Sequence, residues 1–158
     1  MGIFVKSIVP AALLMLAPVA FAQEAQPITL EGEVHAVVET VDADGNTQTE
    51  LVEPGTIVPG NRLLFSTNYT NTGSEPVENF VMTNPLPGPV RLAPDADSDL
   101  VVSVDGGSVW GTLAELSVTA EDGTSRPAQH SDVSHIRWTL DVVEPGESGR
   151  LEYPAIIR

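Results

Sequence analysis

The spacing of apolar residues along this chain favours strands over helices. From residue 28 onward, apolar and polar positions alternate with a period of two, and the 3.6-residue period of an amphipathic helix is almost absent. The clearest run surrounds Trp138, because Ile136 and Leu140 share its face and His135 points the other way. We therefore predict that Trp138 is buried between two sheets and that His135 faces solvent.

The same alternation divides the rest of the chain into short strands separated by turns. Asp44-Gly45 and Asp122-Gly123 stand between alternating runs, which is a strong hairpin signal. The proline-rich stretch 84–89 is expected to lie outside any ladder, because proline has no N–H to donate. The pattern predicts an all-β fold, an immunoglobulin-like antiparallel β-sandwich of about seven to nine strands. The predicted strands cover residues 28–41, 47–53, 63–70, 77–83, 100–104, 116–120, 135–141 and 151–157.

The first 22 residues have the pattern of a secretion signal. Lys6 precedes an apolar run from Ile8 to Phe21, and Ala20-Phe21-Ala22 is the small-x-small pattern that signal peptidase cleaves. We expect a mature chain of residues 23–158 that forms a single β-sandwich domain in the periplasm or outside the cell. The chain has no cysteine, so it cannot carry a lipid on cysteine and disulfides cannot stabilise its fold.

The charge of the mature chain narrows the classes of partner. Removal of residues 1–22 takes away Lys6 and leaves six arginines and 22 acidic residues, a formal net charge of −16. Such a surface repels nucleic acid and anionic lipid head groups and attracts divalent cations. We therefore expect no nucleic-acid partner and no membrane insertion.

Residues 28–53 are predicted to form two strands, whose backbone groups can find pairing partners in two ways. The turn around Asp44-Gly45 favours a hairpin within the chain, because a short turn closes at small entropic cost. The alternative is a strand donated to the sheet edge of another molecule. The hairpin is the favoured interpretation.

Calcium is the one cofactor for which the sequence offers candidate ligands. Two sets of residues have the one-three-five spacing of an oxygen-ligand loop. They are Asp42, Asp44 and Asn46 in one turn, and Asp95, Asp97 and Asp99 in another. Thr47 stands where a calcium-binding EF-hand loop has glycine, and no helices are predicted beside either turn. Solvated acidic turns are the simpler interpretation.

Catalytic residue types cluster only between residues 130 and 135. In an extended strand His130 and Asp132 would share a face and His135 would lie on the opposite one, so the three would not converge. No Gly-x-Ser-x-Gly nucleophile elbow is present. We assign no catalytic residue and predict that the protein is not an enzyme.

Five short motifs in order resemble a known family. They are Pro59-Gly60-Asn61 with Leu63 and Phe65, then Thr70-Asn71-Thr72-Gly73, Leu86-Pro87, Ile136-Arg137-Trp138 and Pro145-Gly146-Glu147-Ser148-Gly149. In this order they resemble the bacterial conserved-repeat domain, a surface domain of unknown function, over about residues 51–158. The resemblance implies an immunoglobulin-like fold and an exported or cell-surface location, and it supplies no catalytic residues. The chain carries one copy, whereas the family often repeats in tandem.

Together these observations predict an exported, non-catalytic structural or protein-interaction module of the bacterial cell envelope. Its expected partner is an envelope or surface protein, or a second copy of this chain. The alternative is a ligand-binding module that holds calcium or a carbohydrate in its acidic loops. An exported hydrolase is the third hypothesis.

Overall fold

The computed structural model describes residues 27–158, so the predicted secretion signal at residues 1–22 lies outside the described part. Regular structure in this part is strand, apart from two 3-10 helices of three residues each. In chain order the elements are β1 (Ile28–Val41), β2 (Thr47–Val52), β3 (Arg62–Asn71), β4 (Val77–Pro85), β5 (Val90–Leu92), β6 (Val101–Ser103), β7 (Gly111–Thr112), η1 (Leu113–Glu115), β8 (Ser117–Thr119), β9 (Ser125–Pro127), η2 (His130–Asp132), β10 (His135–Val143) and β11 (Ser148–Ile157).

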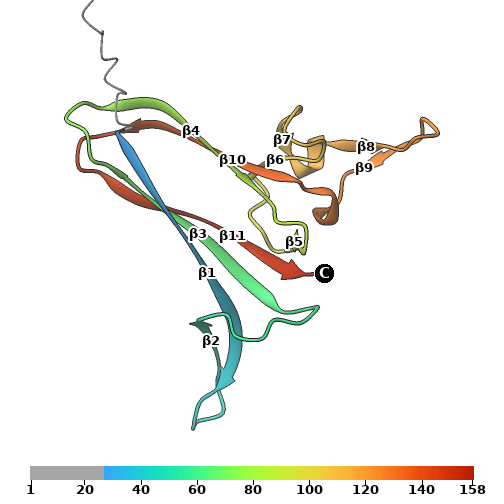
Figure 1. Cartoon of the computed structure of the whole chain (residues 1–158). Coiled ribbons are helices and arrows are strands. Elements are labelled where there is room, and N and C mark those ends of the chain that lie inside the picture. Colours follow the sequence, from blue (N-terminus) through green and yellow to red (C-terminus); the bar gives the residue numbers. More distant parts are fainter. Residues whose placement is uncertain (1–26) are drawn as a thin grey trace, which may run out of the picture.

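The strands form two main antiparallel sheets (Figure 1). One sheet has the order β2-β1-β3-β11-β5, the other has the order β4-β10-β6-β7, and β8 and β9 make a separate hairpin. The chain crosses between the main sheets after β3, after β4, after β5 and again after β10. The all-β sandwich predicted from the alternation is confirmed. The described chain has eleven strands, more than predicted, because several of them are only two or three residues long.

The core lies between the inner faces of the two sheets. Alternate residues of β3 and β11, among them Leu63 and Tyr153, meet Ile136 of β10 and Val102 of β6 there. All four side chains are buried. Removing such apolar surface from water is the main driving force for folding, so the period-two pattern directly specifies this face.

Trp138 occupies the predicted face of β10 but is only half-buried. It packs against the core, with its ring centroid 6.1 Å from that of Tyr153. His135 lies on the opposite face of β10, as predicted, but it is half-buried there, because its ring lies 6.2 Å from that of Trp110 with the two planes 75° apart. Trp110 also lies under the guanidinium of Arg137, 3.6 Å from its ring centroid. A loop residue with no place in the alternation therefore covers the outer face of β10.

Strand β4 ends two residues later than predicted, inside the proline-rich stretch. Strand β4 continues through Asn84 to Pro85, which is paired in register with His135. The prediction that Asn84 and Pro85 lie outside a ladder is therefore wrong. Proline is tolerated here because β4 is an edge strand, so a missing N–H on its free side costs no ladder hydrogen bond.

The two N-terminal strands pair within the chain, as the hairpin interpretation predicted. Residues 28–37 of β1 pair with β3, and residues 36–41 pair with β2. Strand β1 is thus shared between the sandwich and a hairpin that extends beyond it.

Candidate interaction surface

A two-stranded arm projects from the sandwich. Beyond Val37, β1 has no β3 partner and continues with β2 alone (Figure 1). We call residues 38–52 the arm, and residues 53–61, which must cross β1 to reach β3, the crossing loop. Every residue of β2 is exposed, and so are residues 53–60. The core takes apolar side chains of β1 only up to Ala36, so the arm adds none to it.

The sequence of the arm explains why it stays a hairpin. Gly45 has a φ of +85°, which the tight turn requires and which other residues adopt only with strain. The Asp42 carboxylate accepts hydrogen bonds from the backbone N–H of Asn46 at 2.8 Å and of Asp44 at 3.0 Å. The bond from the Asn46 amide, followed by the one from its side chain, lowers the pKa of Asp42. The turn is therefore held by its own side chains without help from the sandwich.

Exposed apolar side chains concentrate on the arm and the crossing loop. Nine large hydrophobic side chains are exposed in the described part of the chain, and five of them lie between residues 41 and 58. These are Val41, Leu51, Val52, Ile57 and Val58. Apolar surface that does not serve the core and gathers at one place is typical of a protein contact.

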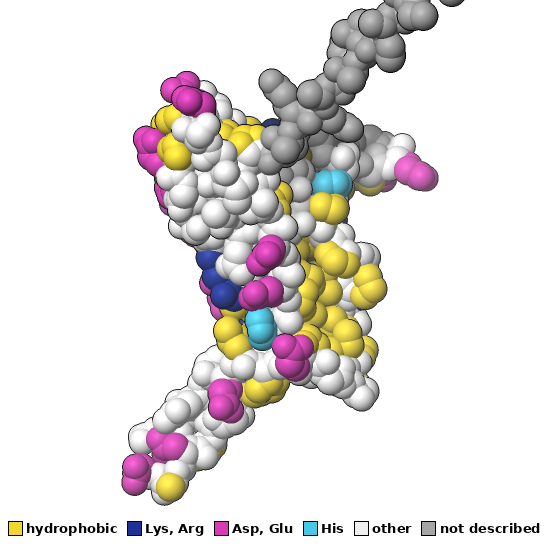
Figure 2. Space-filling view, turned by 60° about the vertical axis from the view of Figure 1, so that its left-hand side comes forward, with side chains coloured by type: hydrophobic (Ala, Val, Ile, Leu, Met, Phe, Trp, Pro, Cys, Tyr) yellow, Lys and Arg dark blue, Asp and Glu magenta, His cyan; other side chains and the backbone are white. Residues whose placement is uncertain are grey.

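The charges of this region all have one sign. Residues 38–61 contain five acidic residues and no lysine, arginine or histidine. Figure 2 shows the arm at the lower left, with acidic side chains in magenta toward its tip. The acidic residues are Glu39, Asp42, Asp44, Glu50 and Glu53. The arm therefore presents apolar and anionic groups together.

A groove of about 650 Å³ lies where the arm meets the sandwich. Val37, Glu39, Thr49 and Leu51 line it from the hairpin, and Leu64 and Pro154 line it from the outer face of β3 and β11. Arg62 and Asp95 also line it and form an ion pair with each other. The groove therefore combines apolar side chains with the carboxylate of Glu39, which has no hydrogen-bond partner among the described residues.

The two candidate calcium triplets occupy separate turns, and three of their carboxylates, those of Asp42, Asp95 and Asp97, already have partners. Asp42 accepts the hydrogen bonds of its own turn, and Asp95 pairs with Arg62, whose side-chain hydrogen bond lowers the pKa of Asp95. Asp97 accepts a hydrogen bond from the amide of Asp99 at 2.9 Å. Within residues 27–158 no three His, Cys, Asp or Glu side chains converge as metal ligands. Calcium binding by these turns stays a prediction.

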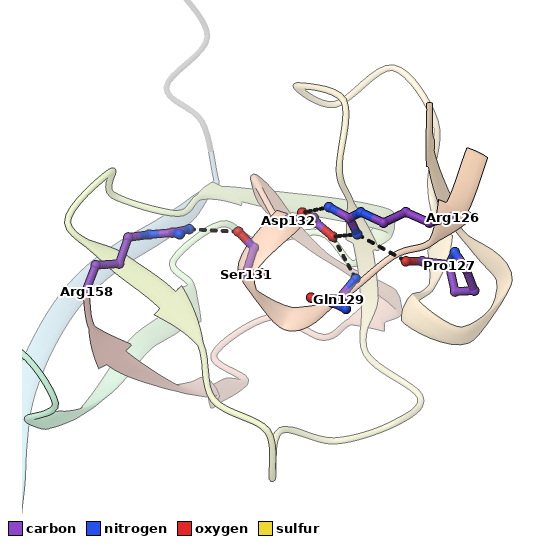
Figure 3. Close-up of polar contacts among 6 residues, drawn as sticks. All are labelled: Arg126, Pro127, Gln129, Ser131, Asp132 and Arg158. Atoms are coloured by element: carbon purple, nitrogen blue, oxygen red, sulfur yellow. Dashed lines mark hydrogen bonds and ion pairs between the residues drawn. The ribbon is translucent and has the colours of Figure 1, made fainter. Parts of the chain in front are cut away.

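The residues around His130 also have structural partners (Figure 3). Arg126 binds both carboxylate oxygens of Asp132, at 2.7 and 2.8 Å, and the amide of Gln129 donates to the same carboxylate. These bonds, with the Arg126 side chain foremost, lower the pKa of Asp132. Arg158 donates to the carbonyl of Ser131 and so ties the end of β11 to η2. His130 and Asp132 belong to η2, whereas His135 begins β10 beside Trp110.

A second hollow of about 360 Å³ opens between β5, β6 and η2. Its walls are mainly apolar, with Leu92, Leu100, Val102 and Ala128 among them, and His130 contributes the one imidazole. Its size is within the range of small-molecule sites. Asp97 of the second acidic turn also lines this hollow.

The sequence predicted the hairpin but not its projection. A signal was present, because the first four residues of β2, Thr47 to Glu50, are polar on both faces. A strand without an apolar face has nothing to contribute to a core. Nothing comparable in the sequence indicated that Trp110 would cover β10, since the loop that carries Trp110 has no apolar periodicity.

Comparison of the chain with protein-family models, curated proteins and solved structures finds no match. Between residues 27 and 158 there is no helix of the length and hydropathy that crossing a membrane requires.

Proposed function

We propose that this chain is an exported, non-catalytic module of the bacterial cell envelope that binds another protein through its arm. The supporting observation is that the arm is ordered by its own turn and adds nothing to the core, and that the arm and the crossing loop together carry five of the nine exposed large apolar side chains of the described residues. Ordering a hairpin costs conformational entropy, and in the isolated sandwich this cost is offset only by partial burial of apolar side chains, since no apolar residue of the arm is fully buried. Contact with a partner would bury this surface.

The experiment compares capture of envelope proteins by two triple variants of the exported chain. The arm variant is Val41→Thr, Leu51→Thr and Ile57→Thr, which removes exposed apolar surface while keeping residues that favour strands. The body variant is Leu30→Thr, Val81→Thr and Val142→Thr, at positions of similar exposure on β1, β4 and β10. Capture is measured by cross-linking in an envelope fraction, followed by mass spectrometry.

We expect the arm variant to keep its melting temperature within about 6 °C of the parent, because each of its three surface substitutions changes stability by no more than about 0.5 kcal/mol. It should lose the captured partner, and the body variant should retain it. Equal capture by the parent and both variants would show that the arm is not the contact surface. Loss in the body variant alone would place the contact on the sandwich.

A further inference from the structure

The sheet edges of this molecule are protected unequally. An exposed edge strand offers unpaired N–H and C=O groups to another chain, and proteins usually block such edges with short strands, proline or backbone irregularities. Strand β4 contains Pro85 and has Asn79 at a φ of +53°, both of which interrupt a regular edge. Strands β5, β7, β8 and β9 have two or three residues each, and Arg158 covers the Val90 carbonyl of β5.

Strand β2 has none of these protections. It pairs with β1 on one side only and forms the end of the five-stranded sheet. Its six residues, Thr47 to Val52, are all exposed and contain neither proline nor glycine, and none of them has a positive φ. Among the edges of the described chain, β2 is therefore the one best suited to accept an added strand.

The side chains around β2 indicate what kind of strand would fit. The arm and the crossing loop carry five acidic residues and no basic one. Glu39 lies on the groove side together with Thr49 and Leu51, and Glu50 is paired in register with Val38 on the other face. A strand beside β2 would place alternate side chains on these two faces. Apolar groups could cover Leu51 and the groove, and cationic groups could pair with Glu39 or Glu50.

We propose that an extended segment of a partner protein, with alternating apolar and cationic side chains, adds to β2 as a sixth strand of this sheet. The inference rests on the proposed function and specifies the chemistry of the partner. A second copy of this chain fits poorly, because two arms with their crossing loops would bring ten acidic residues together in molecules that each carry a net charge of −16 without the first 22 residues. Like charges at such a contact oppose pairing, whereas a basic strand gains from them.

The test uses the full exported chain and three short synthetic peptides. The probe alternates valine and lysine. The first control alternates valine and glutamate, and the second alternates proline and lysine, so it keeps the charge but loses half of its N–H donors. Binding is followed by NMR titration, and amide hydrogen exchange is measured residue by residue.

We expect only the valine–lysine peptide to slow amide exchange in β2, with the protection confined to alternate residues between Thr47 and Val52. Exchange in β4 should be unchanged. Equal binding of the proline–lysine peptide would overturn strand addition, since charge alone would then explain the contact. Protection of β2 without peptide, rising with protein concentration, would show that a second copy occupies the edge and would also overturn the proposal.

Matched charge variants complete the test. Glu39→Gln, Glu50→Gln and Glu53→Gln together should weaken peptide binding by about tenfold, because they remove the local field. Glu78→Gln, Glu121→Gln and Asp141→Asn make the same change in net charge at exposed positions away from the arm, and should have little effect. Equal weakening by both sets would contradict recognition at the arm. If these peptides fail but the arm variant still loses its captured protein, the proposed function stands and only the cationic strand is rejected.

Discussion

At the scale of single residues, Tyr153 shows how completely the inner face of β11 is enclosed. Its side chain is 2% exposed and stacks on Phe65, with ring centroids 5.0 Å apart and planes 2° from parallel. Trp138 closes the cluster from the opposite sheet. Burial disfavours the charged phenolate and raises the pKa of Tyr153 to about 12.

This shift makes stability depend on alkaline pH. The folded pKa lies above the unfolded value of about 10, so the contribution of Tyr153 is complete below about pH 10 and is lost as pH rises toward 12. Lysine side chains, which titrate in the same pH range, do not contribute in the predicted mature chain, because Lys6 is the only lysine and lies in the predicted signal. We expect Tyr153→Phe to flatten the loss of stability between pH 9 and pH 11 in urea titrations. The same loss in the parent and the variant would contradict the assignment.

At the scale of elements, Asn71 joins the two turns that connect the sheets. It is fully buried, and its side-chain amide donates to the carbonyls of Glu75 and Val143, both at 2.9 Å. Its Oδ1 accepts the amide of Gly73, and its own carbonyl accepts the amide of Gly146. The motifs around residues 70–73 and 145–149, which the sequence presented as separate turns, are therefore one hydrogen-bonded junction.

Removal of this side chain should loosen the junction. Asn71→Ala leaves the buried carbonyl of Val143 and the partly buried carbonyl of Glu75 and amide of Gly73 without their partner, and an unsatisfied buried polar group costs about 1–3 kcal/mol. Asn68→Ala is the matched control, because Asn68 lies on the same strand, away from the core, and makes one 3.3 Å contact with Glu33. Urea unfolding of both variants measures the difference. Equal destabilisation would mean that the junction does not hold the sheets together.

At the scale of the whole molecule, the junction and the arm lie at opposite ends of the first sheet. Ile28 is paired in register with Asn71, whereas Val37, where the arm begins, is paired with Arg62 at the other end of β3. The amide of Thr72 donates to the carbonyl of Pro27, so the described chain starts at the junction end. A partner bound at the arm would therefore leave the start of the described chain accessible (Figure 1).

The compartment in which such a partner is met depends on the predicted export. If the first 22 residues are a cleaved signal, intact-mass measurement on protein from an envelope or culture fraction should show a chain that begins at Gln23. Ala20→Lys with Ala22→Lys should block cleavage, because the peptidase requires small residues at these positions. A full-length parent chain in the exported fraction would contradict the prediction.

The sequence by itself determined the class of fold and the position of most of its long strands. Period-two alternation placed Ile136 on an inner face, and turn residues marked hairpins at Gly45 and Gly123. These features could be predicted because they are local: the pleat alternates side chains, and only a few residues tolerate the backbone of a tight turn. The interior positions followed from the gain in burying apolar groups.

The tertiary structure alone decided which polar residues matter and what remains exposed. Asn71 joins two turns only because the chain brings Val143 beside it, and Trp110 shields His135 only because its loop folds over β10. The arm exists because β1 continues beyond the residues that pair with β3. Such contacts join segments that are distant in sequence, and no local preference encodes them. For that reason the sequence predicted a hairpin, and only the fold shows that it projects with an open edge.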